Sequence, residues 1–198
     1  MVTRIPGVMP PNFSAVYALM FCAGVFFPTH LRWSIPFGVM IVTDLALNLY
    51  YQFAKGIDVF SPGIVIYLAA NYFGYAGLVV LGRRFKPTSH FLGLLAGGLL
   101  GAVLFYLITN SVSWLLNPFH NLEYTRDLKG WIIALTRGVG GWPQTWEFFR
   151  NTLLGSGIFT ALFAGAWKLT VAESPTEKGE EDHKGEPQSA AEPEEAKA

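Results

Sequence analysis

Residues 142–167 carry the pattern that decides the class of this protein: WPQTWEFFRNTLLGSGIFTALFAGAW. The stretch begins with aromatic and polar residues and continues as an apolar run, Leu153 to Leu169, of nearly bilayer length. Tryptophan and charged groups favour the headgroup level, whereas the apolar run favours hydrocarbon. The pattern therefore predicts a membrane helix with a polar, aromatic beginning. Gly157, Ala161 and Gly165 recur every four residues and predict a face that another helix backbone approaches closely.

The composition also indicates an integral membrane protein. Of the 198 residues, 52% are hydrophobic and 14% are charged, whereas soluble domains average about 25% charged residues. The net charge is zero, but 11 basic residues and only 5 acidic ones precede residue 171. Beyond Ala172 the sequence is acidic and lacks large apolar residues, so it cannot bury a core. We therefore expect a transmembrane domain over residues 1–170 and a disordered acidic tail over residues 171–198.

Five apolar segments precede the final one and complete the expected fold, an all-α, multi-pass bundle of about six transmembrane helices in the inner cell membrane. The predicted spans are residues 13–27, 35–53, 64–81, 91–109, 128–139 and 153–169. The first lacks a clear cleavage signal, so it is interpreted as a retained span rather than a signal peptide. The fifth is short and contains Arg137, which leaves a tilted span or a re-entrant helix. Basic residues divide five against six between the two sides, which does not decide the orientation.

Small residues form two further stripes at four-residue spacing. Gly93, Gly97 and Gly101 lie on one face of the fourth span. In the first span, Ser14, Ala18 and Cys22 predict either helix packing inside the protein or docking to a partner subunit.

Asp44 is the candidate functional residue with the clearest physical basis. It lies at the midpoint of the second span, Asn48 follows one turn later on the same face, and Asn71 lies near the middle of the third span. An ionised, unpaired Asp at this depth costs on the order of 2.5 to 3.5 kcal/mol, so Asp44 must be neutral, paired or beside a wet cavity. These residues either bind a ligand or proton, or form interhelical hydrogen bonds, worth about 0.6 kcal/mol each, that fix helix register.

A second group of candidates lies at the polar ends of the spans. Aromatic rings that stack, together with amides and a cation, suit a small planar or anionic metabolite, but an interfacial aromatic belt without a ligand has the same composition. Arg150 and Asn151 add an anion preference, because they are expected at the beginning of a helix. The residues are Asn110, Trp114, Tyr124, Thr125, Trp142, Trp146, Arg150 and Asn151.

Other kinds of chemistry lack their sequence signals. The Gly155-Ser156-Gly157 run is not the motif of an intramembrane serine protease, because Leu154 stands where its first glycine should be. One Cys and four scattered His make no metal-ligand pattern, and a phosphate-binding glycine loop is missing. We therefore expect neither an enzyme nor a cofactor, and no nucleic-acid partner.

Four motifs occur along the chain: PNFSAV at 11–16, TDL at 43–45, LITNSVSW at 107–114 and FFRNTLLG at 148–155. Together they resemble an uncharacterised family of bacterial multi-pass proteins described as candidate transport proteins. That family is similar to the substrate-binding S-components of energy-coupling-factor vitamin transporters. The resemblance covers roughly residues 10 to 170, and an acidic residue typical of the family after Leu-Leu-Gly is replaced here by Ser156.

The resemblance implies a six-helix membrane domain that holds a small solute and relies on a separate membrane subunit and an ATPase module for energy. It also implies that both termini are cytoplasmic. The function expected from the sequence is therefore the binding of a small, vitamin-like metabolite for uptake. The alternative is a non-transporting scaffold subunit, in which the polar residues only hold helices together. The expected binding residues are Asp44, Asn48, Asn71, Asn110, Trp114, Trp142, Trp146, Arg150 and Asn151.

Overall fold

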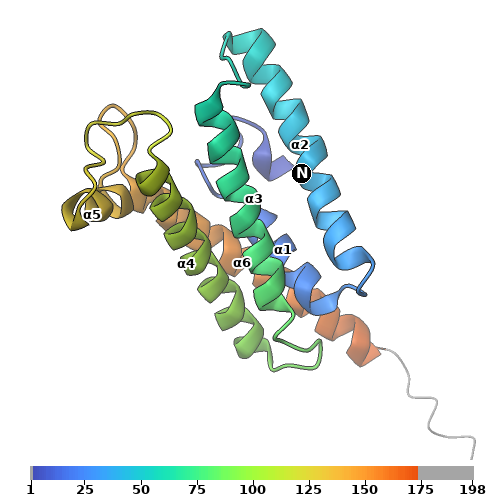
Figure 1. Ribbon diagram of the computed structural model, residues 1–198. Coiled ribbons are helices and arrows are strands. Elements are labelled where there is room, and N and C mark those ends of the chain that lie inside the picture. The colour runs from blue at the N-terminus through green and yellow to red at the C-terminus, as the bar shows by residue number, and fades with distance from the viewer. Residues whose placement is uncertain (1, 174–198) are drawn as a thin grey trace, which may run out of the picture.

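The computed structural model describes residues 2–173, which form helices joined by short connections (Figure 1). The all-α prediction is confirmed for this part of the chain. Residues 174–198, which contain nearly all of the predicted acidic tail, lie outside the described residues. The elements are the 3-10 helix η1 Val2–Arg4 and the α-helices α1 Val16–Phe26, α2 Leu31–Lys55, α3 Pro62–Gly82, α4 Phe91–Leu116, α5 Leu128–Thr136 and α6 Thr145–Glu173.

Four of these helices are long and apolar enough to cross a membrane: α2, α3, α4 and α6, whose candidate spans contain 25, 21, 26 and 27 residues. A span needs about 20 residues, because a helix rises 1.5 Å per residue and the hydrocarbon core is about 30 Å thick. α1 has 11 residues and α5 has 9, so both are shorter than that. The fold is compatible with an integral membrane protein, but the expected count of six spanning helices is not confirmed.

The fourth predicted span continues further than expected. The fourth span was predicted to end at residue 109, but α4 runs through the polar residues 110–114 to Leu116. The hydroxyl of Thr109 donates to the Phe105 carbonyl at 2.9 Å, and the amide of Asn110 donates to the Tyr106 carbonyl at 2.9 Å. These bonds satisfy the polar side chains within the helix itself, so the polar run does not end the helix.

α1 is the central helix of the bundle. It packs against α2, α3, α4 and α6, and nine of its eleven residues are buried (Figure 1). Ala18 and Cys22 are among them, so these two positions of the Ser14 stripe face the protein's own helices. The structure therefore supports internal packing, and not subunit docking, as the role of this stripe.

α1 and α3 cross in close contact at a pair of glycines. A Cβ atom added to Gly24 would lie 2.9 Å from the Gly82 Cα and would overlap the Val79 carbonyl oxygen. A Cβ atom on Gly82 would lie 3.0 Å from the Gly24 Cα and would overlap the Phe21 carbonyl oxygen. The two backbones are therefore in direct contact, which only glycine permits at both positions.

The small-residue stripes predicted on α4 and α6 agree with the observed packing at some positions and differ from it at others. On α4, a Cβ at Gly97 would meet the Phe85 ring at 2.6 Å and one at Gly101 would meet Leu78 at 2.7 Å, but Gly93 is in open space.

On α6, Gly165 is also in open space, so the predicted stripe is not the packed face. The buried face of α6 is formed instead by the residues that precede each position of the predicted stripe. Small hydroxyl residues can form such a face, because they too allow helices to approach closely. Its residues are Thr152, Ser156, Thr160 and Ala164. Ser156 also donates a hydrogen bond of 2.8 Å to the Gly98 carbonyl of α4.

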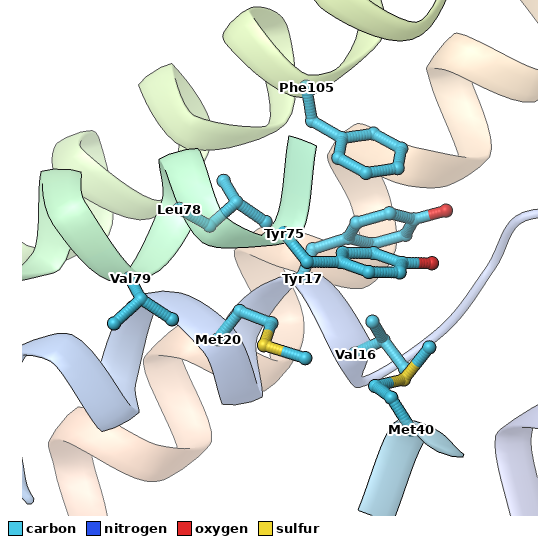
Figure 2. Close-up of a cluster of buried hydrophobic side chains, with 8 residues drawn as sticks. All are labelled: Val16, Tyr17, Met20, Met40, Tyr75, Leu78, Val79 and Phe105. Atoms are coloured by element: carbon cyan, nitrogen blue, oxygen red, sulfur yellow. The ribbon is translucent and has the colours of Figure 1, made fainter. Parts of the chain in front are cut away.

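A cluster of buried side chains joins α1, α2, α3 and α4 (Figure 2). The Tyr75 and Phe105 rings stack at 5.0 Å, and Tyr17 meets Phe105 edge-on at 5.0 Å. α2 has only two buried residues, Pro36 and Met40, and Met40 is its member of the cluster. The first half of α2 is therefore held by the core, while its second half lies at the edge of the bundle (Figure 1).

The glycine crossing yields a first prediction. We expect Gly24→Ala to destabilise the fold by about 1–3 kcal/mol, because the added methyl group overpacks a contact between two backbones. Thermal unfolding in detergent should show a lower midpoint than the natural protein.

Gly38→Ala in α2 is the matched control, because a Cβ at Gly38 meets no atom within 4 Å. Alanine is favoured over glycine in a helix by about 1 kcal/mol, so this variant should be as stable as the natural protein or more so. Equal melting of the two variants would contradict the close crossing.

Candidate functional site

Asp44 is joined to two other segments of the chain. The Arg4 guanidinium forms an ion pair with Asp44 through Nη2 and Oδ1. Its Nη1 donates to the Thr43 hydroxyl at 2.6 Å and lies 3.4 Å from the Met40 sulfur. The second carboxylate oxygen, Oδ2, accepts a hydrogen bond of 2.8 Å from the Tyr72 hydroxyl of α3. The site thus combines the N-terminal segment, α2 and α3.

The pair is largely removed from solvent. The Arg4 side chain is 17% exposed and that of Asp44 is 13% exposed. A charge in such a place is costly unless an opposite charge and hydrogen bonds compensate it. Asp44 has both, so the structure shows the paired state among the three that the sequence allowed. Breaking the pair on either side would leave an uncompensated charge.

Arg4 reaches Asp44 because of the path of the segment before α1. This N-terminal arm, residues 2–15, turns through Gly7 and Asn12, whose φ angles are +81° and +62°. The Thr3 hydroxyl accepts a hydrogen bond of 3.3 Å from the Ala15 N–H, which ties η1 back to the end of the arm. The arm therefore folds back on itself and presents Arg4 to α2.

The last part of the arm is fixed on α6. The Asn151 amide donates to the Pro11 carbonyl at 2.9 Å, and the Phe13 ring lies 5.9 Å from that of Phe159. Gly155 faces the arm backbone, where a Cβ would come within 2.9 Å of the Ser14 nitrogen and oxygen. Two of the motifs that carry the family resemblance, residues 11–16 and 148–155, thus contact each other. Asn151 is buried in this contact and holds the arm.

The other two amides near Asp44 differ in their surroundings. Asn71 of α3 is half-buried and donates to the Tyr67 carbonyl of its own helix at 3.0 Å. Asn48 of α2 is also half-buried, and its side chain makes no hydrogen bond within residues 2–173. Since Asn48 lies one turn from Asp44 on the same helix face, its amide is available to a ligand at Asp44.

The aromatic candidates lie where α4, α5 and α6 meet. The Trp114 indole N–H donates to the Thr125 carbonyl at 2.7 Å, and that of Trp131 donates to the Ser111 hydroxyl at 2.9 Å. These bonds connect the end of α4 to the loop before α5 and to α5 itself. The role of Trp114 in the structure is therefore to hold this connection.

Trp142, Trp146 and Arg150 are exposed. The Arg150 guanidinium lies 5.5 Å from the centre of the Trp146 ring, a cation–π distance. α6 begins at Thr145, so Arg150 lies in its second turn rather than at its beginning. The expected anion site at a helix N-terminus is therefore wrong for Arg150 and Asn151. Within residues 2–173, no hydrogen bond, ion pair or ring contact links these three residues to Asp44.

Two acidic side chains stabilise the loops on either side of α5. The Gly130 N–H and the Thr125 hydroxyl both donate to Asp127 at 2.7 Å, and they hold the pKa of this N-cap carboxyl below its ordinary value. Glu123 accepts a hydrogen bond of 3.1 Å from the Gly140 N–H. Its own backbone N–H and that of Gly140 lower the pKa of Glu123.

The surface has two hollows of interest. One, of about 290 Å³, lies between α1 and α6, is lined mainly by apolar side chains and includes no predicted binding residue. The other, of about 460 Å³, is open and runs along α2 from Ser34 to Thr43. Thr43 therefore borders both this hollow and the Arg4 guanidinium. The described residues include no group of three His, Cys, Asp or Glu side chains that could hold a metal ion.

Sequence reasoning did not identify Arg4 or Tyr72 as members of the site. A partial signal for Arg4 was present, since pairing is one of the states open to an intramembrane Asp and Arg4 is the only arginine or lysine before Arg32. Tyr72 had no comparable signal, because a tyrosine among apolar residues is ordinary in a membrane helix.

The described residues form a helical protein that is compatible with an integral membrane protein and has a paired carboxylate among apolar helices. The chain belongs to a family of unknown function, DUF6580, whose model matches residues 1–177. No curated protein and no solved structure matches the chain.

The ion pair can be tested by a double-mutant cycle with Arg4→Ala and Asp44→Asn. Each substitution alone should lower stability, and the double variant should lose less than the sum, with a coupling energy of about 0.5–3 kcal/mol. Equilibrium unfolding in a fixed detergent measures all four proteins. Arg84→Ala, an exposed arginine, should be additive with Asp44→Asn; coupling of equal size there would contradict a specific pair.

Asp127 provides a pH prediction. Because its pKa is lowered in the folded protein, its contribution to stability is present above the unfolded value and is lost as the pH falls through the folded value. Hydrogen exchange of the Gly130 amide, corrected for intrinsic rates, should therefore show protection that falls as the pH is lowered below the ordinary pKa of an aspartate carboxyl. Asp127→Asn should remove this pH step, because the amide oxygen still caps α5 but does not titrate. An unchanged pH step in this variant would contradict the assignment.

Proposed function

We propose that this protein binds a small metabolite within the membrane for uptake, and that Asp44 is the centre of the binding site. The observation that carries the proposal is a carboxylate within an apolar helix, paired by groups from two other segments. Ionisable residues at such positions are rare and are functional by default.

The surroundings of Asp44 support binding rather than chemistry. They offer hydrogen-bonding groups of several kinds: the carboxylate, the Tyr72 and Thr43 hydroxyls and the unused amide of Asn48. A few placed polar groups in an apolar setting are typical of ligand sites. We accordingly propose a binding subunit and not an enzyme.

We further propose that uptake uses partners, as in the S-components that the motifs resemble. The sequence has no phosphate-binding loop with which to use ATP itself, so a separate membrane subunit and an ATPase module would supply the energy. Because Ala18 and Cys22 are buried, such a subunit would dock on a different face. The inner cell membrane is the corresponding location.

The alternative function is a scaffold subunit, and particular contacts favour it. Asn71 and Asn110 donate to carbonyls of their own helices, and Asn151 fixes the arm on α6. In this alternative, Asp44 is a structural lock between the arm and α2, and no ligand binds.

The two functions are separated by purification from the native membrane in mild detergent, followed by mass spectrometry of the proteins and small molecules that remain bound. Our proposal predicts a metabolite in a ratio of about one to one, and its loss from folded Asp44→Asn protein. Arg84→Ala is the matched control and should retain the metabolite. A partner complex without any metabolite would support the scaffold, and neither a metabolite nor a partner would contradict both functions.

A further inference from the structure

The Arg4 guanidinium is bound by acceptor groups that all belong to α2, and no other residue of the arm takes part. Nη2 pairs with the Asp44 carboxylate, and Nη1 meets the Thr43 hydroxyl and the Met40 sulfur. Positions 40, 43 and 44 lie on one helix face, so α2 alone supplies every acceptor for the cation. We propose that this acceptor set is the binding site for a small organic cation with N–H donors, an amine, amidine or guanidine, and that Arg4 occupies it here. This inference rests on the function proposed above.

The chemistry of the set selects for a cation. Its contacts with Arg4 are made by a carboxylate, a hydroxyl oxygen and a sulfur, which all act as acceptors toward a guanidinium. The Tyr72 hydroxyl donates to Oδ2 of Asp44 at 2.8 Å, which leaves Oδ1 for the guanidinium. An anion would meet an unscreened carboxylate, and a neutral ligand would leave that charge unpaired.

Aromatic rings stand next to the set. The Tyr72 ring lies 6.0 Å from Phe37 and 6.1 Å from Tyr75. These rings make the surroundings of the Tyr72 hydroxyl apolar, which suits the organic part of a cationic ligand better than a hydrated metal ion. The free amide of Asn48, one turn from Asp44, adds a hydrogen-bonding group for the rest of the ligand.

The arm is attached in a way that allows exchange. From Pro11 onward it is fixed on α6 by Asn151 and Phe159. Within the described residues, the hydrogen bonds and the ion pair that hold residues 2–10 to a helix side chain are all made by Arg4. Ile5, Val8 and Met9 are exposed. A cation that replaces Arg4 therefore frees the beginning of the arm from α2 and leaves no buried charge unpaired. The hydrogen bond from the Ala15 N–H to the Thr3 hydroxyl lies within the arm and does not depend on α2. The hollow along α2, which ends at Thr43, gives room beside the site.

The test places a reporter on the arm. Val8→Cys in a Cys22→Ala background gives a single exposed thiol for an environment-sensitive fluorophore. The protein in lipid nanodiscs is titrated with methylguanidinium chloride at constant ionic strength, with acetamide as the neutral control. We expect a saturable fluorescence change with methylguanidinium and none with acetamide.

Variants decide whether the change comes from this site. Arg4→Ala removes the side chain that competes for the site. Methylguanidinium binding, measured by calorimetry, should become about tenfold stronger or more, because the site is then vacant in every molecule rather than in a minor fraction. Asp44→Asn should abolish binding. Thr43→Val, which keeps the carboxylate pair intact, should weaken it severalfold and serves if Asp44→Asn does not fold. Arg84→Ala, an exposed arginine at the end of α3, should bind like the natural protein.

The possible failures differ from those of the proposed function. Binding by Arg4→Ala alone, without a fluorescence change in the natural sequence, would overturn the inference, because Arg4 would then be a structural tie. A co-purified metabolite that is anionic or neutral, or that methylguanidinium does not displace, would overturn the inference and leave the proposed function standing. The absence of both a metabolite and cation binding would overturn both.

Discussion

The contact between the Gly24 and Gly82 backbones is the constraint on which the rest of the structure depends. It lets α1 lie inside the bundle, in contact with α2, α3, α4 and α6. Because the first residue of α1, Val16, is buried, the end of the arm that joins α1 also lies among the helices. The arm consequently runs between α6, where Asn151 and Gly155 hold it, and α2, where Arg4 meets Asp44. Close helix packing at one end of α1 thus determines what can reach the carboxylate near the other.

The sequence was sufficient for the helical class and for the four long helices, because a long apolar run has few alternatives in a membrane. It was insufficient where a helix end or a packed face depends on neighbours. α4 passes through Asn110 because polar side chains can bond to their own helix. The packed face of α6 contains Ser156 and Thr160 rather than Gly165, and spacing alone does not separate two stripes of small residues that lie one position apart. The Gly24–Gly82 contact has no local pattern, since each glycine matters only through the other.

The sequence predicted the candidate site only in part, as it did the fold. The cost of an isolated charge limits Asp44 to a neutral, paired or hydrated state, and the structure shows the paired one. Its partner does not follow, because Arg4 lies 40 positions away in a segment without periodicity. The amides were predicted together but differ in the structure. Asn71 donates to a carbonyl of its own helix, whereas the Asn48 side chain makes no hydrogen bond within the described residues. In the sequence, the two kinds of residue look the same. Only the positions of neighbouring atoms distinguish these cases.

The structural and the functional interpretations of Asp44 rest on the same physical requirement. A carboxylate among apolar helices needs a cation, and the protein supplies one from a short arm rather than from a neighbouring helix. A permanent lock between two helices would be more rigid, since both partners would be fixed by packing along their whole length. A cation on residues 2–10, held to the helices by its own contacts, can be exchanged for another of similar shape and charge at little net electrostatic cost. The placement of Arg4 on the arm thus adds to the paired carboxylate as support for the binding site that we propose.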